Sequence, residues 1–285
     1  MIHDSRICAL GEGAFWHPLR QQFFWFDILG QCLMSQDADG PCVWRFPEMV
    51  SAAAWVSQDV LLIAGERDLF LFDLTTEEIE VLCELEADKP GNRSNDGRAD
   101  RQGGFWIGTM AKGGDMQGKG AIYRYFKGEL RLLYPNISIP NSMCFTPDGK
   151  HAYFSDNMTP HVMKVALDAD GWPAGEPTVF LDHTADGFSP DGAVVDAHGN
   201  FVCAEWGASR VAVYSPAGAL LRTFPFPAPH TTCPAFGGPE LATLFCTSAT
   251  SGLSDEVLAA NPLSGSTFCE PDAGRGLPEP RVLLA

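Results

Sequence analysis

One unit of about 40–50 residues recurs along this 285-residue chain, and the repetition restricts the possible folds more than any other feature. Each copy starts with a turn and a short apolar strand, passes through a turn rich in Asp and Gly, and continues into further strand-like runs. The clearest copies begin at residues 95, 140 and 190, and fainter ones begin at residues 11, 51 and 232. Six copies with three or four strand-like runs each match the blade period of a β-propeller.

One equivalent position in each of the six copies serves as a landmark for measuring the spacing of the repeat. These landmarks lie 39, 45, 45, 50 and 42 residues apart, and they are Glu12, Ser51 (or the adjacent Ala52), Asp96, Asn141, Asp191 and Cys233. Long helical periodicity is absent, which argues against α/β folds and helix bundles. A helical turn is expected only within residues 252–260, with Ser254 as its N-cap. We therefore expect an all-β fold, a six-bladed β-propeller of four-stranded antiparallel blades around a central channel, formed by residues 1–285 as a single domain.

The charge balance excludes two classes of partner. Asp and Glu total 36 against 19 Lys and Arg, a formal net charge of −17, so nucleic acid and anionic membrane surfaces are not expected to bind. Apolar residues make up 45% of the chain, enough for a sizeable core. No membrane-spanning run or signal peptide is recognisable, and the nine cysteines lack C-x-x-C spacing. We expect a cytoplasmic protein with buried thiols; nothing in the sequence indicates its oligomeric state.

The landmark residues are candidates for a metal site. The innermost strand of each propeller blade lines the channel, so equivalent positions are expected to meet at one height around the axis. Glu12, Asp96, Asn141 and Asp191 would then converge, and such oxygen ligands suit a hard divalent cation. The alternative is that Asp and Asn here are turn residues, an interpretation strongest for Asp96 in the run 95–97, Asn-Asp-Gly.

The remaining sequence motifs give little indication of a catalytic or metal-binding function. The chain has no G-x-S-x-G, H-E-x-x-H or Walker loop, and its seven histidines are too scattered to predict a zinc site. The glycine-rich segment 112–120 is either a phosphate cradle or, the preferred interpretation, a loop between strands of the third blade that covers the channel mouth. Most of the aromatic residues, such as Trp16, Trp25, Trp106 and Trp206, fall on alternating strand positions and are expected in the core between blades.

Ordered together, several motifs resemble a known family. They are residues 11–16 (Gly-Glu-Gly-Ala-Phe-Trp), 92–97 with 108–110, 141–150 and 190–196. This set, over residues 11–263, resembles the senescence-marker-protein, gluconolactonase and luciferin-regenerating-enzyme family. Residues 236–239 and 252–255 look like its bacterial sugar-lactonase members in particular.

The resemblance implies a six-bladed propeller that holds one divalent cation. Its ligands would be Glu12, Asn141 and Asp191, and Arg93 and Asn95 would contact the substrate. Asp96 then falls outside the ligand set, as a turn residue. Vertebrate-type members carry an acidic residue where this chain has Ala-Lys-Gly at 111–113, which leaves lid contacts and substrate preference open. The cation is calcium, zinc, manganese, magnesium or iron(II).

The implied activity is hydrolysis of a sugar lactone to the aldonic acid, within sugar-acid catabolism. Asp191 is the candidate general base, and a hydroxide on the cation is the alternative. Three other functions are compatible with these residues: a protein-interaction propeller, a non-catalytic metal-binding regulator, and a promiscuous ester or organophosphate hydrolase. The size of the sugar and the ring form of its lactone are not encoded in any motif.

Overall fold

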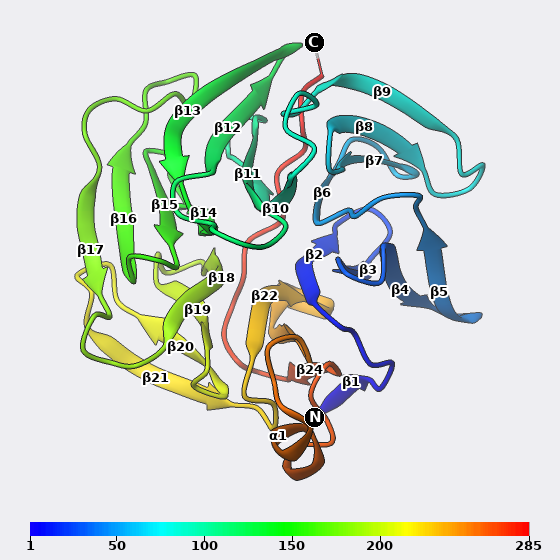
Figure 1. Cartoon of the computed structure of the whole chain (residues 1–285), viewed down its shortest axis with the longest axis vertical. Coiled ribbons are helices and arrows are strands. Elements are labelled where there is room, and N and C mark those ends of the chain that lie inside the picture. The colour runs from blue at the N-terminus through cyan, green and yellow to red at the C-terminus, as the bar shows by residue number, and fades with distance from the viewer. Residues whose placement is uncertain (285) are drawn as a thin grey trace.

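Six four-stranded antiparallel sheets surround one axis in the computed structural model, which describes residues 1–284 (Figure 1). The predicted six-bladed β-propeller is therefore confirmed. Blade 1 contains β2 (Gly11–His17), β3 (Gln22–Asp27), β4 (Cys32–Asp37) and β5 (Gly40–Arg45). Blade 2 contains β6 (Ala52–Trp55), β7 (Val60–Ala64), β8 (Asp68–Asp73) and β9 (Ile79–Glu84). Blade 3 contains β10 (Asn92–Ala99), β11 (Phe105–Ala111), β12 (Gly120–Phe126) and β13 (Glu129–Ile137).

The remaining three blades repeat this arrangement. Blade 4 contains β14 (Pro140–Phe145), β15 (His151–Asp156), β16 (His161–Ala166) and β17 (Thr178–Asp182). Blade 5 contains β18 (Ser189–Val195), β19 (Phe201–Trp206), β20 (Arg210–Tyr214) and β21 (Leu220–Pro225). Blade 6 contains β22 (Thr231–Gly237), β23 (Thr243–Ser248), β24 (Thr267–Glu270) and the N-terminal β1 (Ile2–Asp4). The first strand of each repeat, from β2 to β22, is the innermost one.

The N-terminal strand closes the ring, a feature the repeat pattern did not predict. Strand β1 pairs antiparallel with β24, with Ile2 opposite Phe268, and forms the outer edge of blade 6. The N-terminal amino group donates a hydrogen bond to the carbonyl of Cys269 (2.7 Å). Both ends of the chain therefore contribute strands to the same blade, which joins the last blade to the first.

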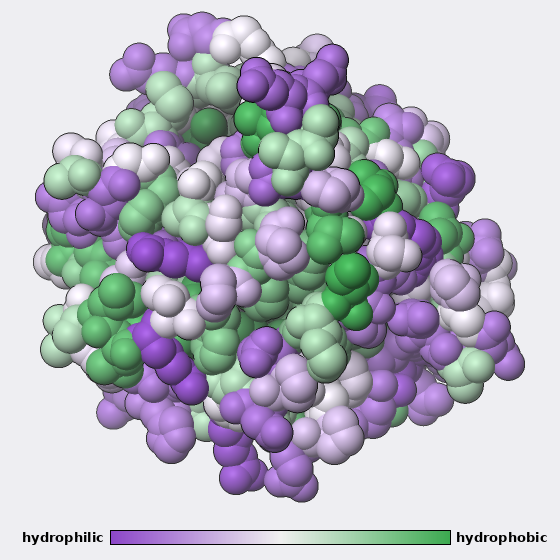
Figure 2. Space-filling view, turned by 90° about the horizontal axis from the view of Figure 1, so that it is seen from below, coloured by the Kyte–Doolittle hydropathy of each residue, from purple (hydrophilic) through white to green (hydrophobic). Residues whose placement is uncertain are grey.

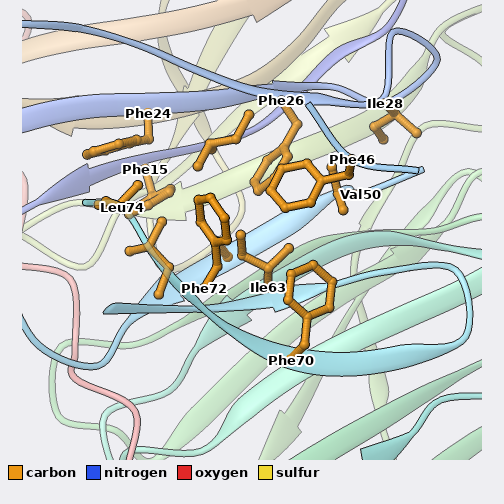
Figure 3. Packing of buried hydrophobic residues seen from close by; sticks show 13 residues of the cluster. Phe15, Phe24, Phe26, Ile28, Phe46, Val50, Ile63, Phe70, Phe72 and Leu74 are labelled. Atoms are coloured by element: carbon orange, nitrogen blue, oxygen red, sulfur yellow. The ribbon is translucent and has the colours of Figure 1, made fainter. Parts of the chain in front are cut away.

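The hydrophobic core is divided among the junctions between blades. Six clusters of buried residues occur in the part of the chain that the structure describes, one at each junction. Figure 3 shows the junction between blades 1 and 2, where Phe24 and Phe26 face Phe70 and Phe72. The first two strands of each blade are covered on both faces, so most of their residues are buried. Trp16, Trp25 and Trp106 lie in these clusters, as predicted.

Outside the blades, the expected helical turn is present as α1 (Asp255–Ala260). The Ser254 side chain caps it by accepting the Val257 N–H (3.3 Å). A 3-10 turn, η1 (Pro239–Leu241), joins β22 to β23.

All nine cysteines are free thiols. Among residues 1–284 no helix has the length and apolar character that crossing a bilayer requires.

The outermost strands are the exposed parts of the blades. Val81 of β9, Val179 of β17 and Leu221 of β21 are each more than half exposed. Hydrophobic and hydrophilic residues are interspersed on the side of the molecule seen in Figure 2.

After β24, residues 271–284 leave the sheets and run across the molecule from blade 6 to blade 3, in red in Figure 1. We call this segment the C-terminal strap.

Deleting residues 1–5 removes β1 and with it the closure of blade 6. We expect the melting temperature to fall by several degrees, because about 1 kcal/mol shifts it by ~2–4 °C in a chain of this size. Thermal unfolding followed by circular dichroism measures the effect. Ile2→Ala, which keeps the backbone pairing, is the control and should change little. A deletion variant as stable as the full chain would contradict this role for β1.

Candidate functional site

A cavity of about 370 Å³ opens at the end of the channel where the inner strands begin. Its lining residues come from the strands of blades 1, 3, 4 and 5 and from loops next to the strands: Leu10, Glu12, Arg93, Asn95, Met110, Met116, Ile139, Asn141, Asn157, Ser189, Asp191, Trp206 and Ser251. All five residues predicted as cation ligands or substrate contacts are in this set. The structure thus brings Glu12, Arg93, Asn95, Asn141 and Asp191 to one cavity, although up to 179 residues separate them.

β-Bulges aim these side chains at the cavity. The pairing register of the inner strand shifts at the landmark position in five blades, from Glu12 to Phe15 in β2 and from Pro190 to Ala193 in β18, for example. A bulge re-aims a side chain without ending the strand. In β2 the bulge requires Gly13, whose φ is +58° and where a Cβ would lie 2.2 Å from the Ser51 carbonyl oxygen.

Hydroxyl groups of neighbouring blades fix the backbone at the same height. In each case a buried Ser or Thr donates a hydrogen bond to a carbonyl oxygen at or beside a candidate residue. The pairs are Ser51 Oγ to Asn95 O (2.6 Å), Ser142 Oγ to Asp191 O (2.6 Å) and Thr232 Oγ1 to Gly11 O. These contacts form a belt of hydrogen bonds between blades, and the candidate residues lie in it.

Arg93, Asn95 and Asn141 form one network on the cavity wall. The Arg93 guanidinium donates to Asn95 Oδ1 (2.8 Å) and to the Ser94 carbonyl (2.7 Å). Asn95 Nδ2 donates to the Pro140 carbonyl (2.9 Å) and to Asn141 Oδ1 (3.3 Å). Both amide hydrogens of Asn95 are thus used within the protein, whereas the guanidinium keeps further N–H donors. Asn95 therefore links Arg93 to the candidate ligand Asn141.

The surroundings of the two carboxyl groups of the site, Glu12 and Asp191, disfavour their charged forms. Burial, reinforced by the nearby Asp96 carboxylate, raises the pKa of Glu12 to about 8, against the opposing effects of the Gly13 N–H and Arg93. Burial and the charges of Glu12 and Asp96 raise the pKa of Asp191 well above its usual range. No described basic side chain forms an ion pair with either group. Neither carboxylate is therefore neutralised by a salt bridge, and Arg93 only partly offsets the effect of burial on Glu12.

Asp96 does not occupy a turn, contrary to the sequence-based expectation. It lies within β10, in the bulge between Ser94 and Gly97, because the strand continues through the Asn-Asp-Gly run. Its carboxylate accepts the Met143 N–H of blade 4 (2.8 Å). Asp96 is absent from the cavity lining, and its carboxylate is used in this hydrogen bond between blades.

The donor set fits a divalent cation. Glu12 and Asp191 supply carboxylate oxygens and Asn141 an amide oxygen, the donor types preferred by hard cations. Clusters of three or more His, Cys, Asp or Glu side chains suited to a metal do not occur among residues 1–284, so a cation here depends on the amide as third donor. The charged side chains that line the cavity are Glu12, Arg93 and Asp191. Two carboxylates face one guanidinium there, and this excess of negative charge favours a cation.

Several cavity residues were not predicted individually from the sequence, among them Met116 and Trp206. Trp206 is one of four tryptophans of which most were expected in the core, and it lines the cavity at the end of β19. One face of its indole stacks on the His230 ring, with centroids 3.8 Å apart and planes at 18°. Segment 112–120 is the loop between β11 and β12, as predicted, and its Met116 reaches the cavity. The alternation of strand residues cannot distinguish a core position from a strand-end position, and Trp206 is at such an end.

Comparison with known proteins gives similarity over nearly the whole chain. The family model described as the SMP-30/gluconolactonase/LRE-like region matches residues 10–250. An L-arabinolactonase of Azospirillum brasilense is 34% identical over 278 residues, which cover 94% of this chain and 90% of that protein. A 6-deoxy-6-sulfogluconolactonase of Pseudomonas putida is 31% identical over 262 residues, which cover 91% and 90%. The crystal structure of a calcium-binding protein, regucalcin, from Agrobacterium tumefaciens superposes with a TM-score of 0.96 at 40% identity, covering 99% of this chain and 97% of that one.

The raised carboxyl pKa values predict a pH-dependent stability of the metal-free protein. A carboxyl group with a higher pKa in the folded chain destabilises the fold as pH rises from its unfolded pKa, here 4.5, to its folded pKa, about 8 for Glu12. We expect the melting temperature of chelator-treated protein to fall between pH 5 and 8, and the increase caused by a divalent cation to grow over the same range.

Differential scanning calorimetry at several pH values measures both trends. The double variant Glu12→Gln/Asp191→Asn is the control, because it removes both charges. Without cation it should be more stable than the wild type at pH 8, and it should not respond to the cation. A cation-induced shift that is equal at pH 5 and pH 8 would contradict the electrostatic account.

Proposed function

Because the chain belongs to the SMP-30/gluconolactonase/LRE-like family, we propose that it is a hydrolase that uses one divalent cation to open a sugar lactone to the aldonic acid, as a step of sugar-acid breakdown. The observation that carries the proposal is the convergence of Glu12, Asn141 and Asp191 with Arg93 on one cavity. The cavity volume of about 370 Å³ is within the range of small-molecule sites. The lactonase names of similar proteins support the choice of substrate.

Glu12, Asn141 and Asp191 are the residues that would hold the cation. Bound there, calcium, zinc, manganese, magnesium or iron(II) would act as a Lewis acid on the lactone carbonyl and stabilise the developing oxyanion. Two carboxylates that form no salt bridge, together with an amide oxygen, favour this interpretation over a protein-interaction propeller. A surface that only binds proteins has no need for buried, mutually repelling carboxylates at its centre.

Residues of the chain bind the lactone, position the groups that contact it and transfer the proton. Arg93 donates its remaining N–H groups to lactone oxygens, and Asn95 holds that guanidinium in place. Asp191 takes a proton from the attacking water, whose oxygen bonds to the carbonyl carbon. When the tetrahedral intermediate collapses, the ring C–O bond breaks, and the proton held by Asp191 passes to the departing ring oxygen. Water and lactone are thereby converted into the hydroxy acid.

The cavity rim supplies apolar contacts for the carbon skeleton of a sugar. Trp206 has one indole face covered by His230, and Met110, Met116 and Ile139 also line the cavity. An aromatic ring fixed on one side is a rigid apolar surface that costs little conformational entropy to use. This mixture of polar and apolar lining fits a neutral, hydroxylated ring better than an anionic ligand, given the excess negative charge of the channel.

Turnover of a panel of lactones tests the proposed function. Purified protein is assayed by pH-stat with γ- and δ-lactones of pentonic and hexonic acids, before chelation, after chelation, and after adding back each of the five cations. We expect hydrolysis that chelation abolishes and one or more cations restore. A chain that binds a cation but hydrolyses no lactone would contradict the proposal, as would preferential turnover of aryl esters or organophosphates.

Replacing Asp191 tests its role as base. General-base assistance contributes ~10²–10⁴-fold to rate, so Asp191→Asn should lower kcat by at least ~10²-fold. Its metal content must be measured in the same samples, because Asp191 is also a candidate ligand. Asp182→Asn, on the exposed outer strand β17, is the matched control and should leave kcat unchanged. Full cation occupancy with unchanged kcat in the Asp191 variant would refute the assignment.

Replacing Trp206 tests the apolar rim. Trp206→Ala should raise KM for a sugar lactone ~10-fold or more, since burial of an aromatic face contributes about 1–3 kcal/mol. The effect on kcat should be smaller, and Trp206→Phe should retain most of the affinity. Trp44→Ala, a half-buried tryptophan on the outer strand β5, is the control. Equal KM values for Trp206→Ala and wild type would exclude the contact.

A further inference from the structure

The C-terminal strap closes the end of the channel opposite the cavity. Two cavities of about 20 and 10 Å³ lie between the strap and the inner strands, each no larger than a water site. A cavity of about 460 Å³ lies between the strap and residues 101–103, the turn that follows β10. The strap is hydrogen-bonded to several blades: Ala197 N–H to Arg275 O (2.8 Å), Arg101 Nη1 to Pro278 O (2.8 Å), Trp55 Nε1 to Glu279 O (2.8 Å) and Leu283 N–H to Gly103 O (2.8 Å). The strap therefore covers the end of the channel that lies opposite the substrate cavity.

Glu279 is the strap residue that reaches into the channel. Its carboxylate pairs with the Arg98 guanidinium of β10, and the two side chains are only 16% and 9% exposed. The other terminal nitrogen of Arg98, Nη2, donates to the Ala14 carbonyl of β2 (3.2 Å). Ala14 lies in the bulge of β2, two residues after Glu12. A chain of contacts thus leads from the strap to the backbone that presents a candidate ligand.

Asp96 makes the equivalent contact on the other side of β10. Its carboxylate accepts the N–H of Met143, which lies two residues after Asn141 in the bulge of β14. Asp96 and Arg98 are separated by one residue on a single strand. Between them they hold the main chain of β14, the adjacent inner strand that carries Asn141, and that of β2, the inner strand two blades away that carries Glu12. Neither side chain lines the substrate cavity, so both act from beneath it.

From this geometry we propose that Arg98, held in place by Glu279 of the strap, is a positioning residue for the cation site. Its hydrogen bond to the Ala14 carbonyl fixes the β2 bulge, and the bulge fixes the direction of the Glu12 carboxylate. Glu279 also balances the guanidinium charge, which would otherwise repel a cation bound above it. The proposal rests on the proposed function, in which Glu12 is a ligand of the cation.

The double variant Arg98→Met/Glu279→Gln tests this role. Both charges are removed together so that neither is left buried without a partner. Full-length, chelator-treated protein is titrated with Mn²⁺ and, separately, with Ca²⁺ by isothermal titration calorimetry. We expect Kd to rise at least 10-fold relative to wild type. Arg98→Lys keeps the charge balance but not the planar, forked guanidinium, and should raise Kd at least threefold.

A second buried ion pair supplies the matched control. Arg124 Nε and Asp100 Oδ2 are 2.6 Å apart, and both side chains are fully buried away from the cavity. The variant Arg124→Met/Asp100→Asn should lower the melting temperature but leave the Mn²⁺ and Ca²⁺ Kd values unchanged. A wild-type Kd in both Arg98 variants, or an equal rise in the control, overturns the positioning role. Absence of cation binding by the wild type would instead contradict the proposed cation site itself.

Discussion

The interruption of regular strand pairing on the inner strands is the constraint on which the site depends. A straight strand would direct alternate side chains into the junctions between blades, whereas a bulge directs one of them into the channel. Gly13 and Ser142 adopt positive φ in the bulges of β2 and β14, and Ser142 does so without being glycine. Such a conformation costs of order 1–3 kcal/mol. The hydrogen bonds that Ser142 Oγ donates to the Asp191 carbonyl and accepts from Ser155 help to hold it there.

This geometry has an electrostatic consequence that links folding to ligand binding. Glu12 and Asp191 are buried at one height of the channel beside Asp96, and their pKa values rise as a result. The six apolar junctions supply the stability that allows such an arrangement to persist. A divalent cation would neutralise the excess negative charge, so its binding free energy would add to the stability of the fold. Arg98 and Glu279, beneath, carry one charge each and balance one another.

The blades were predictable because the repeat spacing reports them directly, and equivalent positions in successive blades had to meet around one axis. That reasoning placed Glu12, Asn141 and Asp191 together, and they line one cavity. The interpretation of Asp96 as a turn residue, based on the local Asn-Asp-Gly signal, was wrong because the pairing of β10 with β11 overrides that signal. Strand β1 and the strap were missed for a different reason. Three residues that pair with a strand more than 260 residues away, and a strap without regular structure, leave no periodic pattern in the sequence.

The central claim is that one divalent cation, held by Glu12, Asn141 and Asp191, enables this propeller to open a sugar lactone. The most direct test is to titrate chelator-treated protein with the activating cation while lactone turnover is recorded at a fixed, saturating lactone concentration. The account predicts turnover that rises linearly and stops rising at one equivalent of cation per chain. Turnover that is already complete in cation-free protein, and unchanged by any cation, would contradict it.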